Sequence, residues 1–413
     1  MEKHLVENTD ILDYGCGSGI LSIAAHKLGA KTVLGIDNDY QALRNAERNK
    51  SLNSADINLL HTSDYQNQTK FDIVIANILL KKKIKVDIIS QSKPTLLKDT
   101  LRTIAISNDN YKYLVENIGG IKNLGWPTTK IKIYSEKNKS RELFEFKNKN
   151  QNNFYLLKYI DLFNLIKKNK FLKFIRLKNY DLEVLKKRNY DLIINSQQNN
   201  SITKKYFQKK IEKNYKSLAH TAIIHHKKVE NKIAKQIFTK NGPLAFLPLS
   251  NNQTSIVFSN NSIKLIDKIN FLKIINKYNY KYKIDKISEV ESFSIKFYAL
   301  RNYIFKNVLS FGDLIHKVHP LAGQGFNMTI RDIKSLSSIL DEDIKLGIDD
   351  GELIAQKFQE KNKHLNYMYG LGIDALNSFF KIDNTLENSL SDPIFKILKN
   401  NKFINKYATM LSN

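Results

Sequence analysis

Apolar and polar positions alternate in short blocks over the first 80 residues. Runs of four to six apolar-rich residues predict buried strands, and the stretches between them carry apolar residues at helical spacing. The predicted strands are 10–14, 32–36, 58–61 and 71–76. The predicted helices are 19–28 and 40–51. Strands that alternate with helices in this way predict the start of a doubly wound, Rossmann-like, three-layer parallel sheet.

The pattern changes after residue 80 and again after residue 310. Residues 81–310 are rich in Asn and Lys and contain short β-branched and aromatic runs, which predict an α+β region. The strands expected there are 85–90, 130–134, 190–195, 218–225, 244–249 and 254–259, with a polar loop at 137–153. Helical spacing over 330–340 and 353–380 predicts a helical carboxy-terminal region. We therefore divide the chain into 1–80, 81–310 and 311–413.

Composition narrows the class of protein. The 413 residues are 42% hydrophobic, which is enough for two or three domains with cores. Cys16 is the only cysteine, which excludes a disulfide framework. No apolar run approaches the roughly 20 residues of a membrane helix. These features predict a cytoplasmic protein.

The net charge of +26 raises the question of nucleic-acid binding. Only 8 of the 66 basic residues are Arg, and the lysines are spread over the whole length. Base readout and phosphate clamps favour Arg. We interpret the charge as a solvated surface that reflects A+T-rich codons, so nucleic acid is not expected as a partner. Attraction to anionic lipid, with peripheral association at the inner membrane face, is the alternative.

A glycine-rich turn follows the first predicted strand. Gly15, Gly17 and Gly19 lie between this strand and a helix, where glycine lets the backbone approach a ligand closely. Asp37 follows the next predicted strand, at a position where a carboxylate can accept both hydroxyls of a ribose. Strand, loop, helix, strand and acid in this order predict a nucleoside-binding site.

This segment resembles the S-adenosylmethionine-dependent methyltransferases that act on large-subunit ribosomal proteins. The resemblance rests on 13–30, 35–39 and 45–49, and on 72–79, which is similar to the family's fourth strand. It implies that Gly15, Gly17 and Gly19 face the methionine part of S-adenosylmethionine. It also implies that Asp37 contacts the ribose, Asp64 the adenine and Asn77 the transferred methyl group. The resemblance ends at about residue 80, and a folded remnant without activity is favoured over a working methyltransferase.

A second glycine-rich loop lies at 311–327. A strand ends in Gly312-Asp313, a turn follows, and the loop opens a helix expected at about Met328. His316 and His319 precede Pro320 and could imitate a metal pair, but no Cys or carboxylate cluster completes a site, so no metal is expected. We interpret them as hydrogen-bonding loop histidines.

From about residue 83 the chain resembles the FAD-dependent aromatic-ring hydroxylases of ubiquinone biosynthesis. The segments that carry the resemblance are 84–90, 99–107, 242–249, 255–258 and 311–327. It implies a flavin-hydroxylase-type α+β substrate domain and a polyprenylated aromatic substrate. The flavin-binding positions that it implies are Arg102, Asp313, Pro320, Gly323, Gln324, Gly325 and Asn327. No catalytic acid or base is carried over.

The flavin resemblance is incomplete. These hydroxylases begin with a Gly-x-Gly-x-x-Gly unit that binds the ADP half of FAD, and here the methyltransferase-like segment stands in its place. The strand at 84–90 ends in Ser90 instead of an acid, and the later Asp-Gly pair is replaced by 196–201. The leading hypothesis is an FAD-dependent aromatic hydroxylase whose activity is impaired or lost. A methyltransferase acting on a ribosomal protein and an inactive fused reading frame are the alternatives.

Overall fold

The computed structural model describes residues 9–37, 39–61, 70–90, 100–136, 142–147, 152–168, 170–177, 181–320, 323–348 and 350–385. The chain folds into two compact units, Met1–Gln68 and Thr69–Asn413. None of the described helices contains a stretch that is long and apolar enough to cross a membrane.

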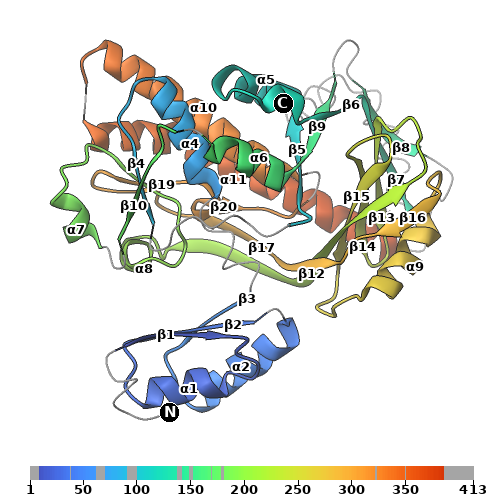
Figure 1. Cartoon of the computed structure of the whole chain (residues 1–413), viewed down its shortest axis with the longest axis horizontal. Helices are drawn as coiled ribbons and strands as arrows, with labels where there is room; N and C mark the ends of the chain where they lie inside the picture. The colour runs from blue at the N-terminus through green and yellow to red at the C-terminus, as the bar shows by residue number, and fades with distance from the viewer. Residues whose placement is uncertain are drawn as a thin grey trace. The chain divides into compact units, whose positions relative to one another are not determined.

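The first unit is a small parallel α/β fold. Its elements are β1 (Asp10–Tyr14), α1 (Ile20–Lys27), β2 (Thr32–Asp37), α2 (Tyr40–Leu52) and β3 (Asn58–His61). The three strands pair in parallel in the order β1-β2-β3, as the sequence predicts. Both helices lie on one side of this sheet (Figure 1). Ile23 of α1 packs there against Val33 and Ile57 to form the core.

The described residues of the second unit form four sheets. The largest has nine strands in the order β20-β17-β12-β15-β14-β13-β7-β8, with β16 paired to β12. These strands are β7 (Lys130–Ser135), β8 (Glu142–Lys147), β12 (Lys210–His226), β13 (Ile233–Thr239), β14 (Gly242–Pro248), β15 (Gln253–Asn260), β16 (Ile284–Ile287), β17 (Glu291–Leu300) and β20 (His316–Lys317). Most of its neighbouring strands are antiparallel, which is typical of an α+β substrate domain.

Three small sheets and several helices complete the second unit. The sheets are the pair β10-β4 and the two triplets β5-β9-β6 and β11-β19-β18. Their strands are β4 (Asp87–Ser90), β5 (Thr103–Ser107), β6 (Trp126–Thr128), β9 (Phe154–Lys158), β10 (Lys173–Arg176), β11 (Ile193–Asn195), β18 (Ile304–Phe305) and β19 (Val308–Ser310). The helices are α4 (Lys70–Lys81), α5 (Asn108–Asn117), η2 (Ile121–Asn123), α6 (Tyr159–Lys167), α7 (Leu182–Lys186), α8 (Ser201–Tyr206), α9 (Lys268–Tyr278), η4 (Gly312–Leu314), α10 (Gln324–Lys345) and α11 (Gly351–Thr385).

The strand predicted over 71–76 is wrong, because these residues lie in helix α4. A continuous apolar run looks the same in sequence whether it forms a buried strand or a buried helix. Ile75, Ile78 and Leu79 are all buried, in the core cluster that includes residues of α5, α6 and α10. A helix that is apolar on several faces is stable only when neighbouring elements surround it, as they do here.

Two boundaries also differ from the sequence expectation. Residues 142–147 of the predicted polar loop form β8, in which Leu143 is buried and Glu142 pairs with Lys132 at 2.7 Å. Cross-strand ion pairs of this kind let a charged segment join a sheet edge. Helix α10 begins at Gln324, four residues before the expected start, because Gly323 takes the left-handed conformation that begins the helix. The two long helices and the other predicted strands are present, although β11 begins at Ile193 and β12 at Lys210, where the sequence predicted 190 and 218.

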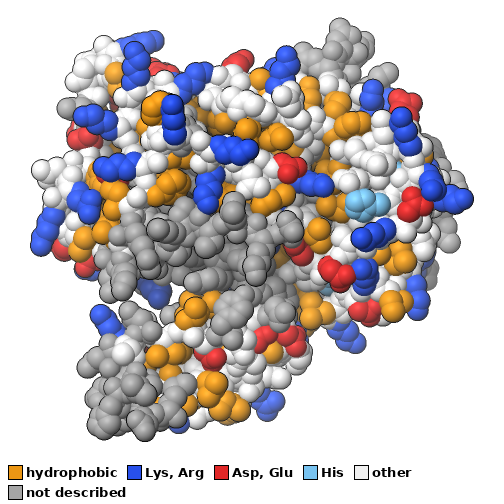
Figure 2. Space-filling view, viewed as in Figure 1, with side chains coloured by type: hydrophobic (Ala, Val, Ile, Leu, Met, Phe, Trp, Pro, Cys, Tyr) orange, Lys and Arg blue, Asp and Glu red, His pale blue; other side chains and the backbone are white. Residues whose placement is uncertain are grey.

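Basic side chains do not gather in one place on the visible face of the second unit. Figure 2 shows Lys and Arg scattered among apolar and neutral residues there. Several lysines have carboxylate partners, among them Lys130 with Glu145 and Lys277 with Glu136. On this face the basic side chains are therefore dispersed, and several of them are paired with carboxylates.

Candidate functional site

Strands β11 and β19 run in parallel and end side by side. The Phe311 amide donates to the Asn195 carbonyl at 2.9 Å, which ties the two strand ends together. The loop after β11 also holds the loop after β19, because Gln198 Nε2 donates to the Asp313 carbonyl at 2.9 Å. The Tyr298 hydroxyl donates to the same oxygen. Carboxyl ends of parallel strands are where open α/β sheets bind ligands.

Asp313 lies in the turn that follows β19. Gly312 has φ 60°, a left-handed conformation that glycine adopts without strain, and it turns the chain directly after the strand. The Asp313 side chain is partly exposed. Its carboxylate has no hydrogen-bond or ion-pair partner among the described residues, whereas its carbonyl has two. The carboxylate can therefore accept hydrogen bonds from a ligand.

Helix α10 begins beside strand β5 and packs against η4. Gly323 precedes its first turn with φ 66°, and a Cβ at this position would lie 3.1 Å from the Ala105 Cβ. No side chain caps the helix, and its first turn has no acidic residue. The amides of Gln324 and Gly325 thus lie at the positive end of a 22-residue helix dipole. Pro320 is partly exposed at the start of the same loop.

Asn327 connects α10 to β5. Its Nδ2 donates to the Ala105 carbonyl at 2.8 Å, and its Oδ1 accepts from the Ser107 amide at 2.9 Å. Asn110 also donates to this Oδ1 at 3.1 Å. The Asn327 side chain is buried, with 3% of its surface exposed. Its carboxamide both donates to and accepts from the backbone of β5, as the peptide groups of a neighbouring strand would. Its carboxamide holds the helix start against β5.

Arg102 lies at the beginning of the same strand. Its guanidinium lies over the Phe293 ring, 4.6 Å from the centroid, and its carbonyl accepts from the Tyr159 amide. The neighbouring Leu101 amide donates to Glu291 at 2.8 Å. These contacts anchor the start of β5 to β17. The structure thus brings Gly323, Asn327 and the strand that follows Arg102 together.

The two loop histidines have different partners. His316 Nε2 is 2.7 Å from Asp332 Oδ2, and both side chains are buried. His319 lies edge-on to the Tyr215 ring, and burial lowers its pKa to about 4. A neutral His319 and a paired His316 support the interpretation as loop histidines that fix the chain before Pro320.

In the first unit the glycine loop and Asp37 form one cluster. Gly15, Gly17 and Gly19 all have positive φ, and Cβ atoms at the first two would meet nothing within 4 Å. Asp37 accepts from the Gly17 amide at 2.7 Å and from the Asp39 amide at 2.9 Å. Its carboxylate is thereby fixed at the end of β2, beside the loop. This geometry suits a ribose, because each carboxylate oxygen can accept more than one hydrogen bond.

Of the other two residues predicted for this cofactor, only Asn77 is among the described residues. Asp64 is outside the described residues. Asn77 belongs to the second unit, where its Nδ2 donates to the Ile166 carbonyl of α6 at 3.2 Å. The structure therefore supports four of the six predicted positions as one cluster.

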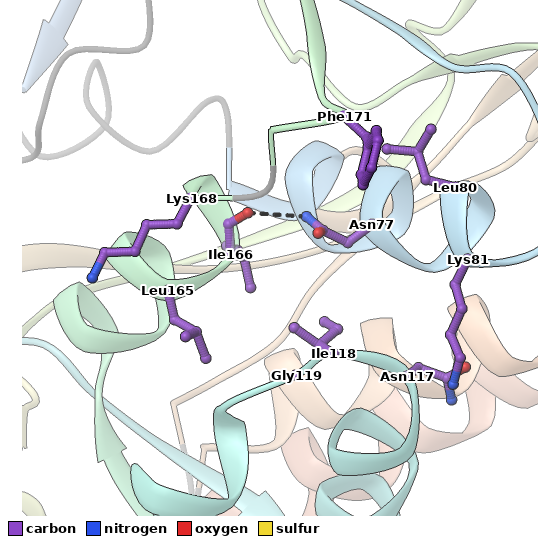
Figure 3. Close-up of a pocket in the computed structure, with 10 residues that line it drawn as sticks. All are labelled: Asn77, Leu80, Lys81, Asn117, Ile118, Gly119, Leu165, Ile166, Lys168 and Phe171. Carbon is purple, nitrogen blue, oxygen red and sulfur yellow. Dashed lines mark hydrogen bonds between the residues drawn. The ribbon is translucent and has the colours of Figure 1, made fainter.

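Asn77 lines a cavity of about 640 Å³ between α4, the end of α5 and the end of α6 (Figure 3). Leu80, Ile118 and Leu165 give it apolar walls, and Lys81 and Lys168 add two cations. This volume is typical of small-molecule sites. No other predicted site residue lines the cavity, so it is separate from the Asp313 loop.

Sequence reasoning missed Gln198 and Tyr298. Both hold the Asp313 carbonyl, but Gln198 lies 115 residues from Asp313 in the chain. The only signal, for Gln198 alone, was that 196–201 stands where the hydroxylases have an Asp-Gly pair. Glutamine and tyrosine at such positions are common on any surface.

Two family models match separate parts of the chain. The model of the ribosomal protein L11 methyltransferase (PrmA) matches residues 1–104, and the model of an FAD binding domain matches 271–354. The second match contains Asp313, Gly323 and Asn327. The chain is therefore similar to a methyltransferase at its start and to flavin-binding proteins around α10.

The curated relatives match the amino-terminal part. The ribosomal protein L11 methyltransferase of Thermosipho africanus is 44% identical over 80 residues, which are 19% of this chain and 31% of the relative. That of Methylobacillus flagellatus is 51% identical over 72 residues, 17% of this chain and 24% of the relative. The chain thus spans a third or less of the length of these two relatives.

Solved structures share the fold over most of the chain. The p-nitrophenol 4-monooxygenase PnpA from Pseudomonas putida DLL-E4 has a TM-score of 0.63 at 9% identity, covering 82% of this chain and 94% of its own. PqsL, a probable FAD-dependent monooxygenase from Pseudomonas aeruginosa, has a TM-score of 0.60 at 14% identity, covering 94% and 99%. The fold is that of the flavin-dependent monooxygenases.

Proposed function

We propose that the chain binds FAD at the Asp313 loop and is an FAD-dependent monooxygenase that hydroxylates an aromatic ring. The observation that carries this is the Asp313 carboxylate, without a partner among the described residues, in a turn that packs against α10. The start of α10, which no side chain caps, adds the positive potential of its free amides beside the same turn. The flavin, when bound, would supply the electrons and activate the oxygen.

The chain's own residues would bind and orient the cofactor. The Asp313 carboxylate would accept hydrogen bonds from the hydroxyls of the ribityl chain. The Gln324 and Gly325 amides would stabilise negative charge on the reduced ring, since helix amino termini attract anions. Gly323 would hold these two amides in place, because without a side chain the start of α10 can pack closely against Ala105 of β5. Arg102, at the start of β5, adds a positive charge on the strand that α10 contacts.

The ADP half of the cofactor would be held weakly. Ser90 ends β4 where the hydroxylases have an acid, and the loop after β11 uses Asn200 to cap α8 at 2.8 Å from the Thr203 amide. Neither offers a carboxylate to an adenosine ribose. We propose that FMN and FAD bind with similar affinity and that the hydroxylase activity is low.

The resemblance to the ubiquinone-pathway hydroxylases supports a polyprenylated, electron-rich aromatic substrate. The net charge of +26 supports an encounter with anionic lipid, where such a substrate resides. Oxygen uptake by the flavin-loaded protein with a prenylated hydroxybenzoate, compared with the unprenylated ring, tests this. A higher rate for the prenylated ring is expected, and equal rates would contradict the lipid-substrate proposal.

Flavin titration tests the binding site itself. The full chain is titrated with FAD and with FMN, and bound flavin is followed by its fluorescence. Asp313→Asn should weaken both flavins at least tenfold, whereas Asp285→Asn, the same change at an exposed strand position, should leave both unchanged. FAD that binds a hundredfold more tightly than FMN would contradict the weak ADP half. A protein that takes up neither flavin would overturn the proposed function.

A second candidate function rests on the first unit. The fixed Asp37 carboxylate beside the open glycine loop supports binding of S-adenosylmethionine, with a ribosomal protein as the substrate to be tested. Calorimetry should show binding that Asp37→Asn abolishes and that Asp56→Asn, an exposed acid of the same unit, preserves. Absence of heat with the unmodified chain would remove this candidate. If neither cofactor binds, the inactive fused reading frame is supported.

A further inference from the structure

Strands β4 and β11 border the same cavity. It has a volume of about 320 Å³, and the residues that precede each strand also line it. Ile88 and Ile89 come from β4, and Ile193 and Ile194 come from β11. The two strands are 103 or more residues apart in sequence but contribute comparable stretches to the lining. The cavity thus lies between two strand segments.

Each of these strands has one edge without a strand partner. Among the described residues β4 pairs only with β10, and β11 pairs only with β19, both in parallel. Along a strand the N–H and C=O groups alternate between the two edges, so an open edge presents main-chain groups that can pair with another strand. Two open edges that border one cavity define a slot for one strand.

The walls of the slot are aliphatic. Leu79 of α4, Leu340 and Ile344 of α10, and Ile354 of α11 line it. Helices that cover an inner parallel strand require apolar side chains on that strand. Lys85 and Asp191 line the slot just outside the strands. Asp87, the first residue of β4, already accepts from the Tyr190 hydroxyl at 2.8 Å and pairs with Lys173 at 3.1 Å. An uncharged aliphatic segment fits these walls.

We propose that this slot binds an extended aliphatic segment of a separate polypeptide, which adds as a β-strand between β4 and β11. A strand in this position needs both of its edges open. Every described strand of this chain already pairs along at least one edge, so none of them, as folded, can fill the slot. The proposal goes beyond the proposed function, because it depends on neither the flavin nor the substrate.

A pair of peptides separates strand addition from simple filling of an apolar cavity. The first is a fluorescein-labelled Lys-Val-Ile-Val-Ile-Val-Lys peptide with blocked ends. The second is the same peptide with N-methyl groups on alternate residues, which keeps the side chains but removes the amide donors of one edge. We expect the first to bind the full chain saturably, with slower amide exchange at 87–90 and 193–195. The second should bind at least tenfold more weakly.

Other outcomes would overturn the proposal. Equal binding of the two peptides would mean that the cavity takes apolar groups without strand pairing. No binding, or slower exchange confined to other strands, would also refute it.

Two variants at the carboxy-terminal end of helix α10 locate the binding: Ile344 lies in its last turn, and Leu346 follows its last residue. Ile344 lines the slot and is 54% exposed, so Ile344→Lys places a charge at the slot without removing a core side chain. Leu346 is 72% exposed and does not line the slot, which makes Leu346→Lys the matched control. We expect at least a tenfold loss of peptide affinity for the first and no change for the second, with unchanged circular dichroism. The same affinity for both variants would contradict the assignment.

Discussion

Asn327→Ala tests whether this residue holds α10 against β5. The substitution leaves the Ser107 amide without its acceptor at 2.9 Å and the Ala105 carbonyl without its donor at 2.8 Å. Each buried polar group that loses its partner costs about 1–3 kcal/mol. Two such groups give a loss of about 4 kcal/mol, which is a large part of the 5–15 kcal/mol typical of a folded protein.

The assay is urea unfolding of the full chain followed by tryptophan fluorescence. Trp126 is the only tryptophan, and it lies in β6 with its Nε1 donating to the Asn231 carbonyl. Its signal therefore reports the second unit and not the first. With an m value of roughly 3 kcal/mol/M or more, the midpoint should fall by about 1 M.

Ser338→Ala is the control on the same helix. The Ser338 hydroxyl is exposed and donates to Glu342 at 3.1 Å, so its removal should change stability by less than about 0.5 kcal/mol. A loss of less than about 1 kcal/mol for Asn327→Ala would show that the bonds to β5 carry little stability. Asn327 would then be a better candidate for direct flavin contact.

Three further predictions concern other parts of the chain. Burial lowers the pKa of His319 and of His220 to about 4 from an ordinary value near 6.5, so the unfolded chain binds more protons between these values. The free energy of unfolding should keep its full value above pH 6.5 and fall by about 3 kcal/mol per histidine towards pH 4, because each pKa unit is worth about 1.4 kcal/mol. A free energy of unfolding, measured by tryptophan fluorescence, that does not change over this pH range would refute the prediction. In α11, a Cβ added by Gly372→Ala meets open space, so this substitution should raise the free energy of unfolding by about 0.5–1 kcal/mol. Gly370→Ala places a Cβ 2.7 Å from an aromatic ring of β17 and should lower the free energy of unfolding. Burial and the nearby Asp13 and Asp37 carboxylates raise the pKa of the Cys16 thiol to about 11. Iodoacetamide should therefore modify this single cysteine far more slowly at pH 8 than it modifies a free thiol. Equal rates would contradict the raised pKa of Cys16.

The fold of the first unit could be predicted because its periodicity is clear. Short apolar runs at 10–14 and 32–36 are separated by a glycine turn and a helix, and local chemistry decides each of these elements. The run at 71–76 could not be assigned in the same way. Its state depends on whether strands or helices surround it, and those neighbours come from α5, α6 and α10.

The candidate flavin site could be predicted only as far as its loop. Gly312 and Gly323 need left-handed backbone, and glycine at a turn is a local signal. The partners of Asn327 lie 220 residues earlier in the chain, and those of Asp313 include Gln198. Contacts over such distances depend on the tertiary fold, so the sequence implied a flavin contact for Asn327 but could not predict its hydrogen bonds to β5.

Helix α4 bears on the choice between the two proposed functions of the chain. The similarity to the methyltransferases extends over residues 1–104. In a doubly wound sheet with the strand order 3-2-1-4, the segment at 72–79 would form the fourth strand and lie beside β1. These residues are helical, and Asn77 bonds to α6 of the second unit. Among the described residues β1 therefore ends its sheet, and no strand lies beside it on that edge.

A glycine loop at the edge of a sheet has fewer walls for a ligand than one at a central strand, because nucleosides bind where two strand ends meet. The Asp313 loop has that arrangement, since β11 and β19 end together beside it. The first unit keeps Asp37 and the glycines, but the residue expected near the methyl group serves the core of the second unit. The flavin site is thus the more complete of the two, and this asymmetry favours the monooxygenase over the methyltransferase.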